Sequence, residues 1–159
     1  MADEAESSDA LTVCQLYARL RRFAAVVAPL DVEPDDLVQE AFARALRVRP
    51  LDEFDDVAAY LGRTMLNLAA NARRRAGHRQ RALARLGPVG RPAPPTYPSD
   101  LAMLSSLAPD VRAVLYLAEV ECWTYAEIGE FVGCTEVAAR RRACRGREAL
   151  RTVLENDDG

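Results

Sequence analysis

The chain has 159 residues, a formal net charge of −3 and an isoelectric point near 5.3. Half of its residues are hydrophobic, which allows a packed core and excludes a globally disordered chain. No apolar stretch reaches the roughly 18 residues of a membrane-spanning helix, and the acidic start MADEAESSD lacks the apolar core of a secretory signal peptide. We therefore expect a cytoplasmic protein without membrane insertion.

Three helices are predicted in a first lobe, residues 10–86, which follows an acidic tail over residues 1–9. The first helix, about 10–28, ends near a proline, which cannot continue a helix. In the second, 36–47, Asp36 and Gln39 have the spacing of a capping box. The third covers 56–76. Apolar residues recur at helical spacing at Leu37, Val38, Ala41, Phe42, Ala45 and Leu46 in the second helix, and at Val57, Tyr60, Leu61, Thr64, Met65, Leu68, Ala69 and Ala72 in the third.

A linker is predicted over residues 87–98, GPVGRPAPPTYP, where five prolines and two glycines exclude a helix interior. Such a segment is extended and semi-stiff, and it separates the first lobe from a second lobe, residues 99–155. No segment has the sustained period-two alternation of a strand, and there is no Asn-Gly or Asp-Gly hairpin turn. The predicted fold class is therefore all-α, with two small helical domains joined by a Pro-rich linker.

The second lobe has the pattern of a helix-turn-helix. A helix of about 100–120 comes first, and Thr124 with Glu127 then forms the capping box of a short helix. Gly133 suits a left-handed turn, and Thr135 can cap a last helix over about 136–153. The residues expected to point inward are Tyr125, Ile128 and Phe131 in the short helix and Ala139, Ala143, Gly146 and Leu150 in the last one. The opposite face of the last helix is rich in arginine, as in DNA-recognition helices.

Positive charge gathers in two segments despite the net negative charge. Residues 63–91 contain eight arginines and no acid, and residues 137–151 contain six arginines and one acid. By contrast, residues 1–40 contain nine acids and three arginines. Two basic helices, each outside an acidic context, indicate two separate contacts with a polyanion. Asparagine and arginine on one face of the third helix suit a single strand, because they can bind base edges and phosphates.

The sequence contains few of the residue patterns that catalytic or metal-binding sites need. The four cysteines, Cys14, Cys122, Cys134 and Cys144, form no Cys-x-x-Cys pair, and the chain has one histidine, so a zinc site is not expected. No Ser/His/Asp set or phosphate-cradling glycine loop is present. We predict no enzyme, no catalytic residue, no metal and no cofactor, with the thiols reduced; a redox switch between distant thiols stays open.

Three segments together resemble a known family. DDLVQEAFARAL (35–46) and AAYLGRTMLNLAANARRR (58–75) are similar to region two of extracytoplasmic-function (ECF) sigma factors. WTYAEIGEFVGCTEVAARRRACRGREAL (123–150) is similar to their region four. The resemblance covers both lobes in the family's order, and it implies a dissociable subunit of bacterial RNA polymerase that recognises promoters. Polymerase core and promoter DNA are the implied partners, with an anti-sigma protein as a further one.

The resemblance also implies the site residues. Contact with polymerase is expected on the mixed-charge face of the second helix, at Asp36, Gln39, Glu40, Arg44 and Arg47. The melted minus-ten strand is expected at Arg63, Asn67, Asn71, Arg73 and Arg74. The duplex minus-thirty-five element is expected at Thr135, Glu136, Arg140, Arg141 and Arg145, because the N-terminal residues of a recognition helix face the bases. Arg142 and Arg147 lie at the flanks, where ion pairs within the lobe compete with DNA.

Some positions depart from the family's pattern. Tyr60 stands where tryptophan is usual, and Leu66 replaces a position that is often basic. Ala139 and Ala143 replace larger apolar residues, which suggests closer or looser packing of the last helix. Two alternatives therefore remain at this stage: a sigma-like mimic that binds polymerase or an anti-sigma protein without reading DNA, and an ordinary helix-turn-helix regulator whose first lobe dimerises or binds a ligand.

Overall fold

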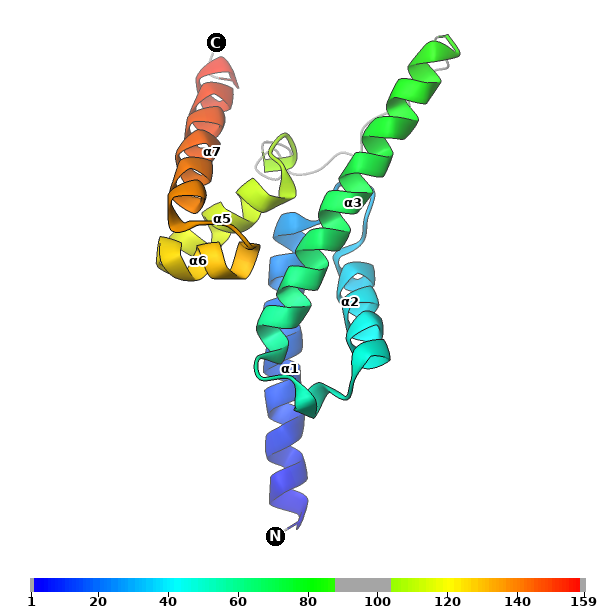
Figure 1. Cartoon of the computed structure of the whole chain (residues 1–159), viewed down its shortest axis with the longest axis vertical. Helices are drawn as coiled ribbons and strands as arrows, with labels where there is room; N and C mark the ends of the chain where they lie inside the picture. The colour runs from blue at the N-terminus through cyan, green and yellow to red at the C-terminus, as the bar shows by residue number, and fades with distance from the viewer. Residues whose placement is uncertain (1, 88–103, 158–159) are drawn as a thin grey trace.

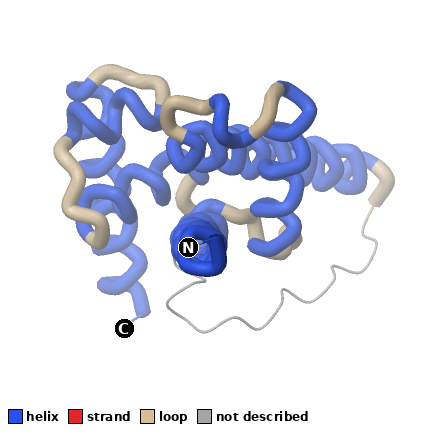
Figure 2. The backbone as a smooth tube through the Cα atoms, turned by 90° about the horizontal axis from the view of Figure 1, so that it is seen from below, coloured by secondary structure: helices blue, strands red, loops and turns tan. Residues whose placement is uncertain are grey.

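The structure, a computed structural model, describes residues 2–87 and 104–157, and every regular element within them is helical (Figures 1 and 2). The all-α prediction is confirmed, while most of the predicted linker lies outside the described residues. The elements are α1 (Ala2–Val27), α2 (Pro34–Val48), the 3-10 turn η1 (Leu51–Glu53), α3 (Val57–Arg85), α5 (Pro109–Glu119), α6 (Tyr125–Val132) and α7 (Glu136–Asp157).

In the first lobe α1, α2 and α3 pack on one another, and the C-terminal end of α3 projects beyond the bundle (Figure 1). Asp56 is the N-cap of α3: its carboxylate accepts a hydrogen bond from the Ala59 backbone N–H at 2.9 Å, which fixes the start of the helix. α1 and α3 are longer than the predicted helices. The core that α1, α2 and α3 share contains Leu20, Phe23, Ala24, Val27, Leu37, Val38, Ala41, Ala45, Leu61, Met65, Leu68 and Ala69.

Two predictions about α2 were wrong. Glu33 precedes the helix as its N-cap without a side-chain hydrogen bond, and Pro34 opens the first turn. Asp36 and Gln39 therefore lie inside the helix and form no capping box. Pro34 suits the first helical position, because the N–H that it lacks would have no partner within the helix. Leu46, predicted on the apolar face, is 59% exposed, because it lies at the edge of that face.

In the second lobe the predicted helix of 100–120 is interrupted. Leu104 and Ser105 are helical, the chain turns at Ser106 and Leu107, and Ala108 has an extended backbone with φ −64° and ψ 148°. Pro109 explains the break, because it disfavours helical backbone in the residue before it and begins a new helix.

The predicted turn chemistry of the second lobe is confirmed. Thr124 and Glu127 form a reciprocal capping box at the start of α6. Gly133 ends α6 in the left-handed conformation, with φ 79°, which glycine adopts without steric cost. The Thr135 hydroxyl accepts a hydrogen bond from the Ala138 N–H at 3.2 Å, and this cap starts α7 at the predicted place.

The two lobes dock on each other. α5 packs on α1, and both α5 and α6 contact α3. The contact includes an edge-to-face pair between Phe23 of α1 and Phe131 of α6, with ring centroids 5.6 Å apart. It also includes Arg112 of α5, which is 5% exposed. The described lobes thus share one continuous core rather than standing apart.

Candidate nucleic-acid interface

The outer face of α3 carries the residues predicted to bind a single strand. Arg63 and Asn67 are exposed and have no hydrogen bond or ion pair within the described residues. Both follow buried positions of the same helix, such as Leu61 and Met65, so the helical repeat directs them away from the core. These two side chains are therefore available to a ligand.

The other three α3 candidates have partners inside the protein. Arg74 donates to the Asn71 side-chain oxygen, so these two residues form one polar group. Arg73 donates to the Ser106 carbonyl oxygen at 3.2 Å, a bond from the first lobe to the second. The structure thus brings the five predicted residues to one helix but leaves only Arg63 and Asn67 without a protein partner.

The start of α7 carries the residues predicted to read a duplex. Thr135 and Glu136 lie at the helix N-terminus and are exposed. Arg140 donates to Glu136 at 2.8 Å, and its guanidinium lies 5.4 Å from the centre of the Tyr125 ring. Both side chains of this ion pair are more than half exposed, so the pair is a weak contact that leaves the Arg140 guanidinium accessible.

Two further arginines on α7 are free to contact DNA. Arg141 and Arg145 are exposed and make no hydrogen bond or ion pair with the described part of the chain. Arg142 and Arg147, predicted as flanking residues, instead pair within the lobe: Arg142 lies 3.1 Å from Asp110 and Arg147 lies 2.7 Å from Glu119. Arg147 also donates to the Tyr125 hydroxyl, so these two arginines brace α7 against its neighbours.

Small residues let α7 pack closely on the rest of the lobe. Ala139 and Ala143 are fully buried. A methyl group on Gly146 would lie 2.8 Å from side-chain atoms of both Leu115 and Val111, so only glycine fits there without a shift of its neighbours. Buried small residues at these three positions therefore line the side of α7 that packs on α5 and α6.

The outer face of α2 is exposed and mixed in charge, as predicted. Asp36, Gln39, Arg44 and Arg47 are solvent-accessible, and Glu40 is half-buried. Arg44 donates to Glu40 at 2.7 Å, and this bond holds the pKa of the Glu40 carboxyl below its usual range. Such a face offers both signs of charge to a protein partner.

The sequence reasoning missed Arg112. Its guanidinium donates to the backbone carbonyls of Ala28 and Val27, both at 3.0 Å. Burial, followed by repulsion from Arg73, lowers the pKa of Arg112 to about 10. The sequence held one partial signal: Arg112 stands among the apolar residues Pro109, Ala113 and Leu115, and a charge buried among such residues requires a polar partner.

Metal and membrane sites are not supported. No group of three or more metal-ligating side chains occurs among the residues that the structure describes, and the four cysteines are unbonded. No described helix is long and apolar enough to cross a membrane.

Family models match both lobes. Residues 13–79 match sigma-70 region 2, and residues 101–150 match sigma-70 region 4. The chain is also 32% identical over 148 residues to RNA polymerase sigma factor CarQ of Myxococcus xanthus, covering 86% of this chain and 83% of CarQ. The chain belongs to the ECF family of RNA polymerase sigma factors. It is a sigma factor that binds core polymerase and promoter DNA and directs transcription initiation.

Two further comparisons agree. ECF RNA polymerase sigma factor SigE of Mycolicibacterium smegmatis is 31% identical over 147 residues, covering 86% of this chain and 57% of SigE. The sigma factor RpoE, solved in complex with the anti-sigma factor NepR from Bartonella quintana, has the same fold, with a TM-score of 0.68 at 20% identity. That match covers 93% of this chain and 97% of RpoE. No finding favours either alternative, and the match of the first lobe to sigma region 2 speaks against an ordinary helix-turn-helix regulator.

Proposed function

We propose that this sigma factor divides promoter recognition between its lobes and acts by binding alone, without catalysis of its own. In this proposal the face of α3 holds the melted minus-ten strand, and the N-terminal part of α7 reads the duplex minus-thirty-five element. The observation that carries it is that each lobe exposes arginines without protein partners on one helix face: Arg63 on α3, and Arg141 and Arg145 on α7.

The chemistry of the two faces supports different forms of DNA. The Asn67 side chain has both a donor and an acceptor for the edge of an unpaired base, while Arg63 can bind the adjacent phosphate. On α7, Arg140 and Arg141 can pair with guanine in the major groove, and Glu136 can accept from cytosine. Arg145, one turn further along the helix, suits a phosphate.

The α2 face is proposed as the contact with core polymerase. It is exposed, carries both signs of charge and lies outside the surface where the lobes dock. Asp36→Arg should weaken binding to core by about tenfold, the effect of losing one favourable charged contact and gaining a repulsive one. The matched control is Asp52→Arg in η1, an exposed acid outside α2, which should leave core affinity unchanged.

The division of labour is tested with holoenzyme on two probes from one promoter, identified first by transcription of genomic fragments. One probe is a forked template with the minus-ten strand already single, and the other is the upstream duplex. Asn67→Ala should weaken binding to the fork, and Arg141→Ala binding to the duplex. Equal losses on both probes for both variants would contradict the division.

Two further assignments belong to the same proposal. We place the protein in the cytoplasm, where RNA polymerase acts. We also expect an anti-sigma protein as a partner, since RpoE, which has the same fold, was solved with one. A protein that co-purifies with this sigma factor and blocks transcription by the holoenzyme would support this expectation. If no co-purifying protein lowers transcription when it is added to the holoenzyme, the expectation is wrong.

A further inference from the structure

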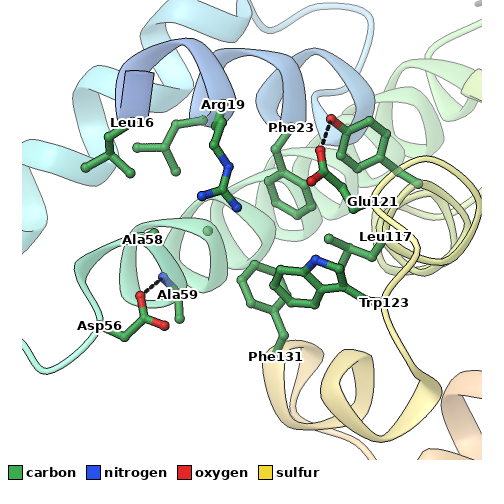
Figure 3. Close-up of a pocket in the computed structure, with 13 residues that line it drawn as sticks. Leu16, Arg19, Phe23, Asp56, Ala58, Ala59, Leu117, Glu121, Trp123 and Phe131 are labelled. Atoms are coloured by element: carbon green, nitrogen blue, oxygen red, sulfur yellow. Dashed lines mark hydrogen bonds between the residues drawn. The ribbon is translucent and has the colours of Figure 1, made fainter. Parts of the chain in front are cut away.

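A cavity of about 180 Å³ lies where the two lobes meet, and none of the residues assigned above to DNA or polymerase lines it. Its apolar wall is aromatic: Figure 3 shows Phe23, Trp123 and Phe131 converging on it from both lobes. The ring centroid of Phe131 is 5.6 Å from that of Phe23 and 5.5 Å from that of Trp123, both in edge-to-face geometry. The rings hold one another, so this wall is in place before any ligand binds.

The cavity has the size of one aromatic ring. A cavity of about 150 Å³ lined by apolar side chains is large enough to bind benzene. On the α3 side the lining residues are small, since Ala58 and Ala59 contribute one methyl group each and Gly62 contributes none. A phenyl-sized group therefore fits against the aromatic wall, where edge and offset contacts between rings favour it.

The polar groups that line the cavity are charged and have no ionic partner among the described residues. Arg19 of α1 is exposed and makes no hydrogen bond there, and Figure 3 shows its side chain extending from α1 toward α3. The Asp56 carboxylate accepts one hydrogen bond, from the Ala59 N–H. The Glu121 carboxylate also accepts one, from the Tyr116 hydroxyl at 2.9 Å. Both signs of charge are therefore left to pair with a ligand.

These charges select among the ligands that fit. The lining carries one arginine and two carboxylates, a net charge of −1, so an apolar molecule with only a negative charge is repelled by the carboxylates. A molecule with only a positive charge leaves Arg19 unpaired. An uncharged molecule partly removes all three groups from water without giving any of them a partner, which is unfavourable. A small zwitterion with one apolar group satisfies both signs.

We propose that this cavity is a binding site for a free α-amino acid with a phenyl-sized apolar side chain. The apolar side chain packs against the aromatic wall of Phe23, Trp123 and Phe131. The ligand carboxylate pairs with Arg19 and the ligand ammonium group with Glu121. The site is a further function of the chain, distinct from promoter recognition.

The test is a titration of the full-length chain with L-phenylalanine, followed by calorimetry and by the emission of Trp123. This residue is the single tryptophan and lines the cavity, so its emission reports on the site. We expect one molecule per chain with a dissociation constant of about 0.1–1 mM, the range for a ligand of about twelve non-hydrogen atoms. Glycine, which has no apolar group, should bind at least about tenfold more weakly.

Two analogues separate the charges of the ligand. 3-Phenylpropionate lacks the ammonium group and phenethylamine lacks the carboxylate, and each should bind about tenfold more weakly than L-phenylalanine, the effect of losing one charged contact. Arg19→Met should weaken L-phenylalanine and 3-phenylpropionate about tenfold without weakening phenethylamine. Glu121→Gln should weaken L-phenylalanine and phenethylamine without weakening 3-phenylpropionate. A general loss of folding cannot produce this crossed pattern.

Two more variants complete the design. Arg22→Met is the matched control, because Arg22 is an exposed arginine one turn further along α1 and does not line the cavity; it should bind L-phenylalanine as wild type does. Ala59→Leu should abolish binding, because the larger side chain enters the space of the ligand. Circular dichroism confirms that each variant keeps its helices.

None of these measurements involves DNA or polymerase, so their outcome does not depend on the proposed function. Saturable binding of L-phenylalanine with the crossed pattern supports the site. No binding up to about 10 mM, ten times the weakest expected dissociation constant, would overturn it. So would equal weakening of all three ligands by both charge variants. If either analogue binds wild type at least as tightly as L-phenylalanine does, the cavity does not select an amino acid and the assignment is wrong.

Discussion

The two helices proposed to contact DNA, α3 and α7, differ in how their arginines are held. On α7 the neighbours come from one lobe: Arg140 is paired with Glu136 and lies near the Tyr125 ring, and Arg147 is paired with Glu119. On α3 some of the neighbours come from the other lobe: the Ser106 carbonyl accepts a hydrogen bond from Arg73, and Glu127 and Glu130 line a groove together with Arg63.

This difference teaches that the two faces depend on different parts of the molecule. The side chains beside the α7 face come from its own lobe. Part of the surroundings of the α3 face comes from the second lobe, so those surroundings depend on how the two lobes are placed relative to each other.

The largest expected effect comes from removing the exposed side chains of the α3 face. Holoenzyme with Arg63→Ala and Asn67→Ala together should form open complexes about 10- to 100-fold less well, because two contacts to bases or phosphates are lost. Run-off transcript yield measures the effect. A double substitution at exposed positions near the end of the same helix, Gln80→Ala with Arg85→Ala, should stay within about twofold of wild type. Equal losses in the two double variants would mean that the α3 face acts through general charge alone.

The next prediction tests whether the packing of α7 depends on its small buried residues. Ala139→Leu should lower the free energy of unfolding by about 1–3 kcal/mol, because the side chain is fully buried and the added atoms have no space. Urea unfolding followed by circular dichroism measures it. Ala126→Leu, at an exposed position of α6, is the control and should change stability little. If Ala139→Leu is as stable as wild type, α7 packs more loosely than the structure indicates.

A third experiment sharpens the roles along α7. Arg141→Ala should reduce discrimination between the correct and a mutated upstream element by about 1–3 kcal/mol. Arg145→Ala should instead weaken binding to all sequences and reduce the slope of log affinity against log salt by about one. Holoenzyme binding at several salt concentrations separates the two. The same sequence-independent loss in both variants would show that neither side chain reads bases.

The smallest effect concerns the capping box that starts α6. Thr124→Ala should destabilise the protein by about 1 kcal/mol at neutral pH. Hydrogen bonds from the Thr124 side chain and backbone keep the pKa of the Glu127 carboxyl below its usual range. Because the folded pKa is the lower one, this stabilisation is present above the unfolded pKa and is lost as the pH falls through the folded pKa.

The difference in unfolding free energy between wild type and Thr124→Ala should therefore narrow in acid, below about pH 4. Unfolding measured at a series of pH values provides the test. A constant difference from neutral pH to strong acid would show that the Glu127 carboxylate takes no part in the cap.

Local chemistry predicted much of each lobe. The capping box at Thr124, the left-handed Gly133 and the cap at Thr135 depend on residues close in sequence, and all three were confirmed. Pro109 also acts locally, yet residues 100–120 were predicted as one helix, so the break before Pro109 was missed.

The docking of the lobes could not be predicted in the same way. Arg112 binds carbonyls 84 and 85 residues earlier in the chain, and backbone carbonyls leave no mark in a sequence. Phe131 was expected to point inward, which it does, but two of its neighbours, Phe23 and Gly62, belong to the other lobe. The neighbours of Arg63 and Arg73 could not be predicted either. Local periodicity predicts the helix face on which the two arginines lie, but it does not predict which groups of the second lobe lie beside them.

Run-off transcription tests the central claim most directly. Purified full-length protein is combined with bacterial core polymerase on genomic fragments from the same organism, with core alone as the control. We predict transcripts that begin at discrete sites only when the protein is present, and that decrease when either the α3 or the α7 face is altered. Transcription no different from that of core alone, with the protein still bound to core, would contradict the account and favour a mimic that does not read DNA.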